Sequence, residues 1–202
     1  MSLFITFEGA DGCGKTTQIE LLDKYLQGKG LKTLVTREPG AKGLGEKLRE
    51  ILLNYDGEVS PNCESFLFLA DRAQHVDCVI KSALKESKIV LCDRHTDSTV
   101  AYQGYGRQLD LKRIKALNEI AVNGLKPDLT IVFDIDIETS MQRVGKTKDR
   151  MESAGMDFFN RVREGYLAIA KDEPDRVKVI NSADTIENIH KQVIALVERL
   201  WG

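Results

Sequence analysis

Glycines, a lysine and a hydroxyl side chain follow one another closely near the start of the chain. Residues 9–16 read Gly-Ala-Asp-Gly-Cys-Gly-Lys-Thr, the pattern G-x-x-x-x-G-K-T. Such glycines let the backbone curl so that successive N–H groups point inward, and the lysine adds a mobile cation. This nest suits the β- and γ-phosphates of a nucleoside triphosphate, with the Thr16 hydroxyl on a bridging magnesium ion. The predicted triphosphate-binding residues are Gly9, Ala10, Asp11, Gly12, Cys13, Gly14, Lys15, Thr16 and Thr17.

Charged pairs follow two later apolar runs. Arg37 and Glu38 come after the run 32–36, and Asp93 and Arg94 come after the run 88–92. Asp93 could hold magnesium or its water, while Arg94 could reach phosphates. Arg37 and Glu38 could orient a phosphate or a sugar hydroxyl, or form a solvated turn, and the sequence favours neither.

An aromatic ring and a guanidinium share one predicted helix face. Phe68 and Arg72 lie four residues apart, so they should be neighbours on that face. The ring could stack on a nucleobase while the arginine donates to a base carbonyl. A core phenylalanine beside a surface arginine has the same spacing, and spacing alone favours that second interpretation.

Basic residues crowd the segment 142–153, at Arg143, Lys146, Lys148 and Arg150. Phosphoryl transfer spreads negative charge over the transferred group, which cations on a closing lid would stabilise. The segment is therefore expected to be a cationic lid, with an exposed helix and loop as the alternative.

These residues need a scaffold of alternating strands and helices. Apolar runs predict strands at 3–7, 32–36, 88–92, 129–134 and 176–180. Helical periodicity predicts helices at 17–27, 45–54, 61–87, 111–123 and 186–201. The alternation predicts an α/β fold with a parallel sheet and helices on both faces, whose ligands bind at the carboxyl ends of the strands.

Bulk properties describe one ordinary globular domain over residues 1–202. Charged residues make up 30%, hydrophobic residues 42%, and the net charge is −2, so no nucleic acid partner is expected. The sequence has no eighteen-residue apolar stretch and no leader pattern, which predicts a cytoplasmic protein without a membrane partner. The four cysteines are expected to be free thiols, and no zinc site is expected because the histidines lack ligand spacing.

Several ordered motifs together resemble the bacterial thymidylate kinase family. They are FEGADGCGKTT at 7–17, TREPG at 36–40, LADR at 69–72, DRH at 93–95 and AYQG at 101–104. The resemblance continues through 118–119, 123–130, the basic segment and FFNRVREGY at 158–166, so it spans nearly the whole chain.

The resemblance implies the P-loop NTPase three-layer sandwich, with a five-stranded parallel sheet of order 2-3-1-4-5. It implies a homodimer that phosphorylates dTMP to dTDP with ATP and Mg²⁺ in dTTP biosynthesis. It also implies that Phe68 stacks on thymine, that Arg72 bonds O4, and that Thr99 or Gln103 reads the remaining polar edge. The other implied substrate residues are Asp11 near the 3′-hydroxyl, Glu38, Arg49 and Arg94 around the monophosphate and magnesium, and Tyr102 against the 2′ position.

The chain departs from the family pattern in two places. Some family members have an arginine inside the phosphate loop, but residues 10–13 here offer no cation. The lid must then supply it, with Arg150 as the first candidate, because DRME at 149–152 resembles the family's lid, and Arg143 as the second. The catalytic set is thus Lys15, Asp93, Arg94, Arg150 and Arg143, and the metal set is Thr16 and Asp93. Ala41 and Lys42 replace a glycine and a small hydroxyl residue that are common in relatives.

Three other functions share part of this pattern. A kinase for a different nucleotide or a nucleoside would share the phosphate loop and differ in base preference. A GTP-dependent switch would need an Asn-Lys-x-Asp motif for guanine, which the sequence lacks. An inactive relative would be expected to have lost residues such as Lys15, Thr16 or Asp93, and all three are present.

Overall fold

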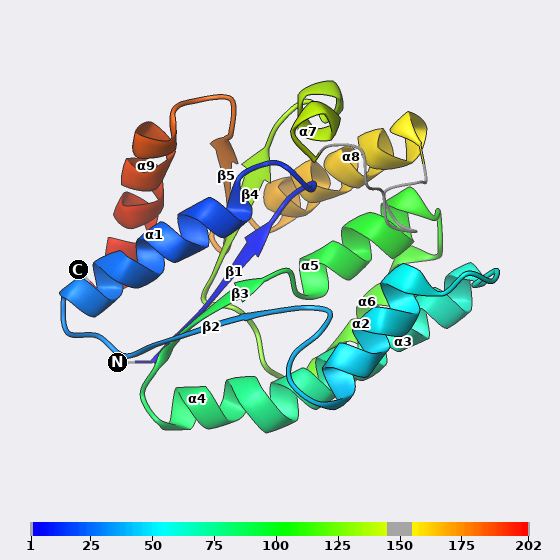
Figure 1. Ribbon diagram of the computed structural model, residues 1–202, viewed down its shortest axis with the longest axis horizontal. Coiled ribbons are helices and arrows are strands. Elements are labelled where there is room, and N and C mark those ends of the chain that lie inside the picture. Colours follow the sequence, from blue (N-terminus) through cyan, green and yellow to red (C-terminus); the bar gives the residue numbers. More distant parts are fainter. Residues whose placement is uncertain (1, 145–154, 202) are drawn as a thin grey trace.

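The computed structural model describes residues 2–144 and 155–201 and contains one parallel sheet (Figure 1). Its strands are β1 (Leu3–Glu8), β2 (Thr33–Arg37), β3 (Ile89–Asp93), β4 (Leu129–Asp134) and β5 (Val177–Asn181). They lie in the order β2-β3-β1-β4-β5, which confirms the expected sheet. Each strand begins and ends within one residue of its predicted position, because short β-branched and apolar runs are a strong signal for buried parallel strands.

Alternate residues of β1 pack on opposite faces of the sheet. Ile5 and Phe7 belong to a core shared with α1 (Lys15–Gly28) and α9 (Ile186–Glu198), which pack against each other (Figure 1). Phe4 belongs to a second core on the other face, and the Glu8 side chain lies on that face as well. Both faces are therefore covered, as expected for a parallel sheet.

Further helical segments cover the face opposite α1 and α9 or flank it. They are α2 (Leu44–Asn54), α3 (Pro61–His75), α4 (Lys81–Lys85), α5 (Thr96–Thr99), α6 (Leu111–Val122), α7 (Ile137–Val144) and α8 (Met156–Asp172). Two π-helical stretches join them, η1 (Val76–Ile80) and η2 (Val100–Gly106). Within the described ranges, no helix is both long enough and apolar enough to cross a membrane.

The helices differ from expectation in two ways. The single helix expected at 61–87 is α3, η1 and α4 in succession, because the backbone widens into a π-helix at 76–80. The segments α5, η2, α7 and α8 were not predicted. Polar residues at 93–99 and glycines at 104 and 106 obscure the periodicity of the first two, whereas the apolar residues of α8 do carry a helical pattern.

Candidate active site

The phosphate loop joins β1 to α1 at the carboxyl edge of the sheet. Gly9 has φ +136°, and a Cβ there would lie 2.6 Å from the Phe133 carbonyl oxygen, so only glycine fits. Gly14, at φ +93°, precedes the first turn of α1. Lys15 is buried, and its Nζ donates to the carbonyl oxygens of Gly9 and Ala10, each at 3.0 Å. The loop thus forms the curled, lysine-backed nest that the sequence predicts.

Two oxygen-bearing side chains flank this loop. Thr16 lies in the first turn of α1 with an exposed side chain, and Asp93 ends β3, in register with Phe7 of β1. Asp93 Oδ1 is buried and accepts no hydrogen bond from the described residues. An unpartnered carboxylate oxygen is a ligand that Mg²⁺ prefers, so this residue pair fits the expected metal.

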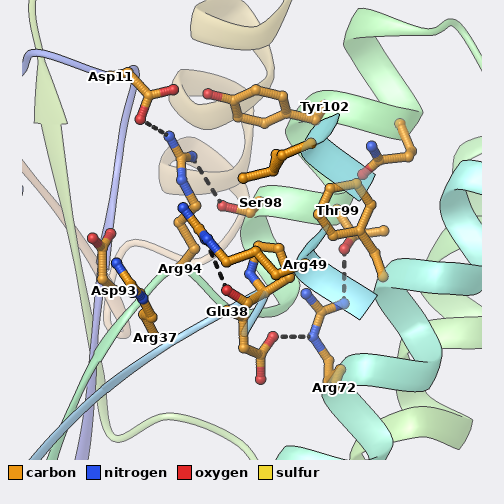
Figure 2. A pocket seen from close by; sticks show the side chains of 14 residues that line it. Asp11, Arg37, Glu38, Arg49, Arg72, Asp93, Arg94, Ser98, Thr99 and Tyr102 are labelled. Carbon is orange, nitrogen blue, oxygen red and sulfur yellow. Dashed lines mark hydrogen bonds and ion pairs between the residues drawn. The ribbon is translucent and has the colours of Figure 1, made fainter. Parts of the chain in front are cut away.

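A cavity opens next to the loop, and Figure 2 shows its walls. All nine predicted substrate residues line it: Asp11, Glu38, Arg49, Phe68, Arg72, Arg94, Thr99, Tyr102 and Gln103. Arg37, Pro39, Leu53, Asp93 and Ser98 complete the lining. Residues that are far apart in the sequence therefore meet at one edge of the sheet.

Arg94 is fixed above the end of β3 in an uncommon backbone conformation, with φ +68°. Its Nη2 lies 2.8 Å from Asp11 Oδ1, and its Nη1 donates to Ser98 Oγ at 3.4 Å (Figure 2). The same Nη1 also donates to Tyr166 OH at 3.3 Å. Burial would raise the pKa of Asp11, but Arg94 and Lys15 outweigh burial and lower that pKa to about 2. These contacts hold the Arg94 cation at the wall of the cavity.

Behind Arg94 lies a fully buried carboxylate that the sequence analysis missed. Glu8 Oε1 accepts from the His95 backbone N–H at 2.7 Å, and Oε2 accepts from Ser98 Oγ at 2.5 Å and Tyr166 OH at 3.0 Å. Burial and the charge of Asp97 raise the pKa of Glu8 to about 7, although the Ser98 hydrogen bond opposes the shift. Ser98 and Tyr166 are thus held by Glu8 on one side while they contact Arg94 on the other.

Arg72 is buried at the far end of the cavity. Its Nε donates to Glu38 Oε2 at 2.8 Å, and its Nη2 donates to the His95 carbonyl oxygen at 2.9 Å. Its Nη1 donates to Thr99 Oγ1 at 2.7 Å (Figure 2) and to Asn118 Oδ1 at the same distance. A guanidinium has five N–H groups, so one N–H on Nη2 is left for a ligand.

Glu38 lies in the wall with its carboxylate turned toward protein donors. His75 Nδ1 and His95 Nδ1 both approach Oε1 at 2.9 Å, while Arg72 holds Oε2. Burial would raise the pKa of Glu38, but His95, Arg72 and the hydrogen bonds hold it well below its usual value. No local motif predicts that two distant histidines contact this carboxylate. The expectation that Glu38 lies beside the monophosphate stays a prediction.

Phe68 is partly exposed at the cavity wall. The interpretation that spacing alone favoured, a core phenylalanine beside a surface arginine, is therefore wrong for both residues. Phe68 faces the cavity, and Arg72 is only 1% exposed. The helix turns them to one side as expected, but it buries the arginine and leaves the ring accessible.

A second hollow lies on the other side of the phosphate loop. It is lined by Gly12, Cys13, Gly14, Thr17, Gln18, Arg143, Ser182, Asp184, Ile186 and Ile189. Gln18 Oε1 and Ser182 Oγ are buried without a hydrogen-bond partner among the described residues. Arg143 Nη1 donates to the Ser182 carbonyl oxygen at 3.5 Å. Sequence analysis did not find this hollow, because the segment after β5 has no recognisable motif.

The other predicted lid residues, Lys146, Lys148 and Arg150, lie outside the described residues. The expectation of free cysteines is confirmed: Cys13 and Cys92 are buried, and Cys63 and Cys78 are exposed.

Comparison with known proteins identifies the family. A family model described as thymidylate kinase matches residues 7–193. The chain belongs to the thymidylate kinase family. A thymidylate kinase of Maridesulfovibrio salexigens is 47% identical over 99% of this chain and 97% of its own. One from Thermoanaerobacter sp. strain X514 is 46% identical, with 97% of each chain covered.

Structural comparison agrees with this assignment. A crystal structure of thymidylate kinase from Ehrlichia chaffeensis matches with a TM-score of 0.81 and 38% identity. The match covers 97% of this chain and 98% of that one. The expected P-loop fold and family membership are thus both confirmed.

Proposed function

We propose that this protein is a magnesium-dependent kinase that transfers the γ-phosphoryl group of ATP to dTMP, giving dTDP for dTTP synthesis. One observation carries the proposal. A single cavity, next to a phosphate loop, joins the cation Arg94 to an accessible aromatic ring, Phe68, and to Arg72, a buried guanidinium with one remaining N–H. A nucleotide has the matching chemistry, with a phosphate at one end and a ring with polar edges at the other.

The donor ATP is assigned to the loop and the second hollow. The backbone N–H groups of residues 9–14 and Lys15 would bind its β- and γ-phosphates. The unpartnered oxygens of Gln18 and Ser182 give the hollow acceptors for the amino group of a base. Thr16 and Asp93 would hold the magnesium ion, which neutralises phosphate charge when it is bound.

The acceptor dTMP is assigned to the cavity. Phe68 would stack on thymine, and the remaining Nη2 hydrogen of Arg72 would point to O4. Arg94 and Arg49 would bind the monophosphate, while Asp11 would lie near the 3′-hydroxyl. Tyr102 would fill the space that a 2′-hydroxyl needs. Glu38 would act indirectly here, by holding Arg72 in place.

Catalysis by these residues would consist of positioning and charge neutralisation. The attacking oxygen belongs to a phosphate that is largely ionised at neutral pH, so no strong general base is required. Lys15 and Arg94 would balance charge from the two sides of the transferred group. A lid cation, Arg150 first and Arg143 second, would supply the charge that residues 10–13 lack.

A coupled assay of ADP release with a panel of nucleoside monophosphates tests the function. We expect dTMP to give the highest kcat/KM among the acceptors. Preference for another acceptor would instead identify a kinase for a different nucleotide.

The homodimer and the cytoplasmic location are also proposals. Phe66 on α3 and Ile120 on α6 are 58% and 77% exposed, and the two helices contact each other. Exposed apolar side chains on neighbouring helices suit contact with a second copy. Sedimentation velocity should give a dimer for the wild type and a monomer for Phe66→Glu. A monomeric wild type would reject the proposed homodimer.

The unpaired cysteines suit a reducing compartment, as the proposed cytoplasmic location requires.

A further inference from the structure

A buried ion pair lies behind the cavity and has no part in the function described so far. Glu64 of α3 is 1% exposed, and Arg107 follows η2. Arg107 Nε donates to Glu64 Oε1 at 3.2 Å, and Arg107 Nη2 donates to Glu64 Oε2 at 3.1 Å. A third donor reaches the same carboxylate, since Gln103 Nε2 lies 3.0 Å from Glu64 Oε1.

This contact decides which way the Gln103 side chain points. A glutamine amide has a donor end and an acceptor end, and without a partner it can present either one. Glu64 forms a two-point ion pair with Arg107, and a carboxylate in such an ion pair only accepts hydrogen bonds. The Nε2 end of Gln103 must therefore face Glu64, and the Oε1 end must face away from it.

The acceptor end of Gln103 is the end left for the nucleotide cavity. Gln103 lines that cavity although it is 1% exposed, and none of the described residues donates a hydrogen bond to its Oε1. The remaining N–H of Arg72 belongs to the same cavity wall. The wall thus offers one donor, on Arg72, and one acceptor, on Gln103.

We propose that Glu64, held by Arg107, is a specificity-determining positioning residue: it fixes the Gln103 amide so that the cavity accepts thymine or uracil and rejects cytosine. The inference rests on the proposed function, because it needs dTMP in this cavity. Thymine and uracil present an O4 acceptor beside an N3–H donor, which complements Arg72 and Gln103. Cytosine presents an N4 amino donor beside an N3 acceptor, so both contacts would be mismatched.

The variant Glu64→Gln tests this role. A glutamine at position 64 can donate as well as accept, so Gln103 is free to turn over. At saturating ATP, we expect the KM for dTMP to rise about tenfold or more with kcat changed far less. We also expect the ratio of kcat/KM for dTMP over dCMP to fall about tenfold or more. The exposed Glu20→Gln serves as the matched control and should keep both values.

A double-mutant cycle shows whether Glu64 acts through Gln103. Gln103→Leu removes the amide, so Glu64→Gln should cause no further loss of selectivity in that background. An unchanged dTMP-to-dCMP ratio in the folded Glu64→Gln protein, or an equal loss in both backgrounds, overturns the inference. The proposed function is tested separately, because it fails only if the wild type does not prefer dTMP.

A measurement on the wild type covers the case in which Glu64→Gln does not fold. The Nε2 protons of Gln103 can be assigned by NMR from their absence in Gln103→Leu. They should exchange slowly with solvent and shift little when dTMP binds, because they face Glu64. A large shift on addition of dTMP would place the donor end against the base and overturn the inference.

Discussion

Asp11 of the phosphate loop and Arg94 at the end of β3 form an ion pair, with 2.8 Å between Oδ1 and Nη2 (Figure 2). The pair links two segments that lie 83 residues apart in the sequence. Ser98 and Tyr166 contact the same guanidinium from behind. If Arg94 binds the phosphate as proposed, the phosphate would meet a cation that is already oriented, and little reorganisation would be needed when charge develops there.

Lys15→Ala is expected to fold and to lose activity by orders of magnitude in kcat. Lys15 is the cation of the phosphate loop, and phosphoryl transfer relies on neutralising charge at this place. Stopped assays of dTDP formation measure the loss, and circular dichroism confirms the fold. Substantial turnover by a folded Lys15→Ala protein would remove Lys15 from the mechanism.

Phe68→Ala should raise the KM for dTMP about tenfold to a hundredfold, because stacking on an aromatic ring contributes about 1–3 kcal/mol per base. The KM for ATP should stay near its wild-type value, since Phe68 lines only the acceptor cavity among those described. Steady-state kinetics with each substrate varied in turn measures both effects. The exposed Tyr55→Ala is the control, and an unaltered KM for dTMP in Phe68→Ala would exclude stacking.

Arg150→Ala should lower kcat far more than it raises the KM for dTMP, whereas Arg143→Ala should have the weaker effect on kcat. A cation that contacts only the transferring group stabilises the transition state more than the bound substrate. Arg143, beside the second hollow, should affect the KM for ATP as well. If Arg150→Ala retains the wild-type kcat, the missing charge comes from another residue.

Glu8→Gln should change how stability depends on pH. Burial and the charge of Asp97 raise the pKa of Glu8 in the folded protein to about 7, above its ordinary value of 4.5. Between those values the unfolded state binds fewer protons, so raising the pH favours unfolding of the wild type. As pH rises from 5 to 8, the free energy of unfolding of the wild type should therefore fall by on the order of 3 kcal/mol relative to that of Glu8→Gln.

Urea unfolding at several pH values measures this difference. The exposed Glu20→Gln provides the comparison, and it should follow the wild type throughout. If the free energies of unfolding of the wild type and of Glu8→Gln change in parallel with pH, Glu8 does not titrate in this range.

Local sequence signals predict the sheet and the phosphate loop well. The strands are short buried runs, and the glycines at 9 and 14 are needed by their own backbone angles, so neighbouring residues suffice. All nine substrate residues that the family resemblance implies are among the fourteen that line the cavity.

Contacts between distant side chains are not visible in the sequence. The meeting of His75 and His95 on Glu38 depends on how α3 packs against the segment after β3. In the sequence, Glu8 is only the polar end of a strand. Its role becomes visible in the fold, where Ser98 and Tyr166 donate hydrogen bonds to it. The hydrogen bond from Gln103 to Glu64 likewise depends on how η2 lies against α3.

The four protein acceptors on Arg72 have a practical consequence for inhibitors. A guanidinium that is rigidly held, with one remaining hydrogen, cannot reorient for a new scaffold. An inhibitor must therefore place an acceptor oxygen at the position of that hydrogen. Heterocycles with a carbonyl at this point and an adjoining N–H are the natural starting fragments. Larger groups gain more by growing along Phe68 toward Arg94 than by displacing the contacts that hold the arginine.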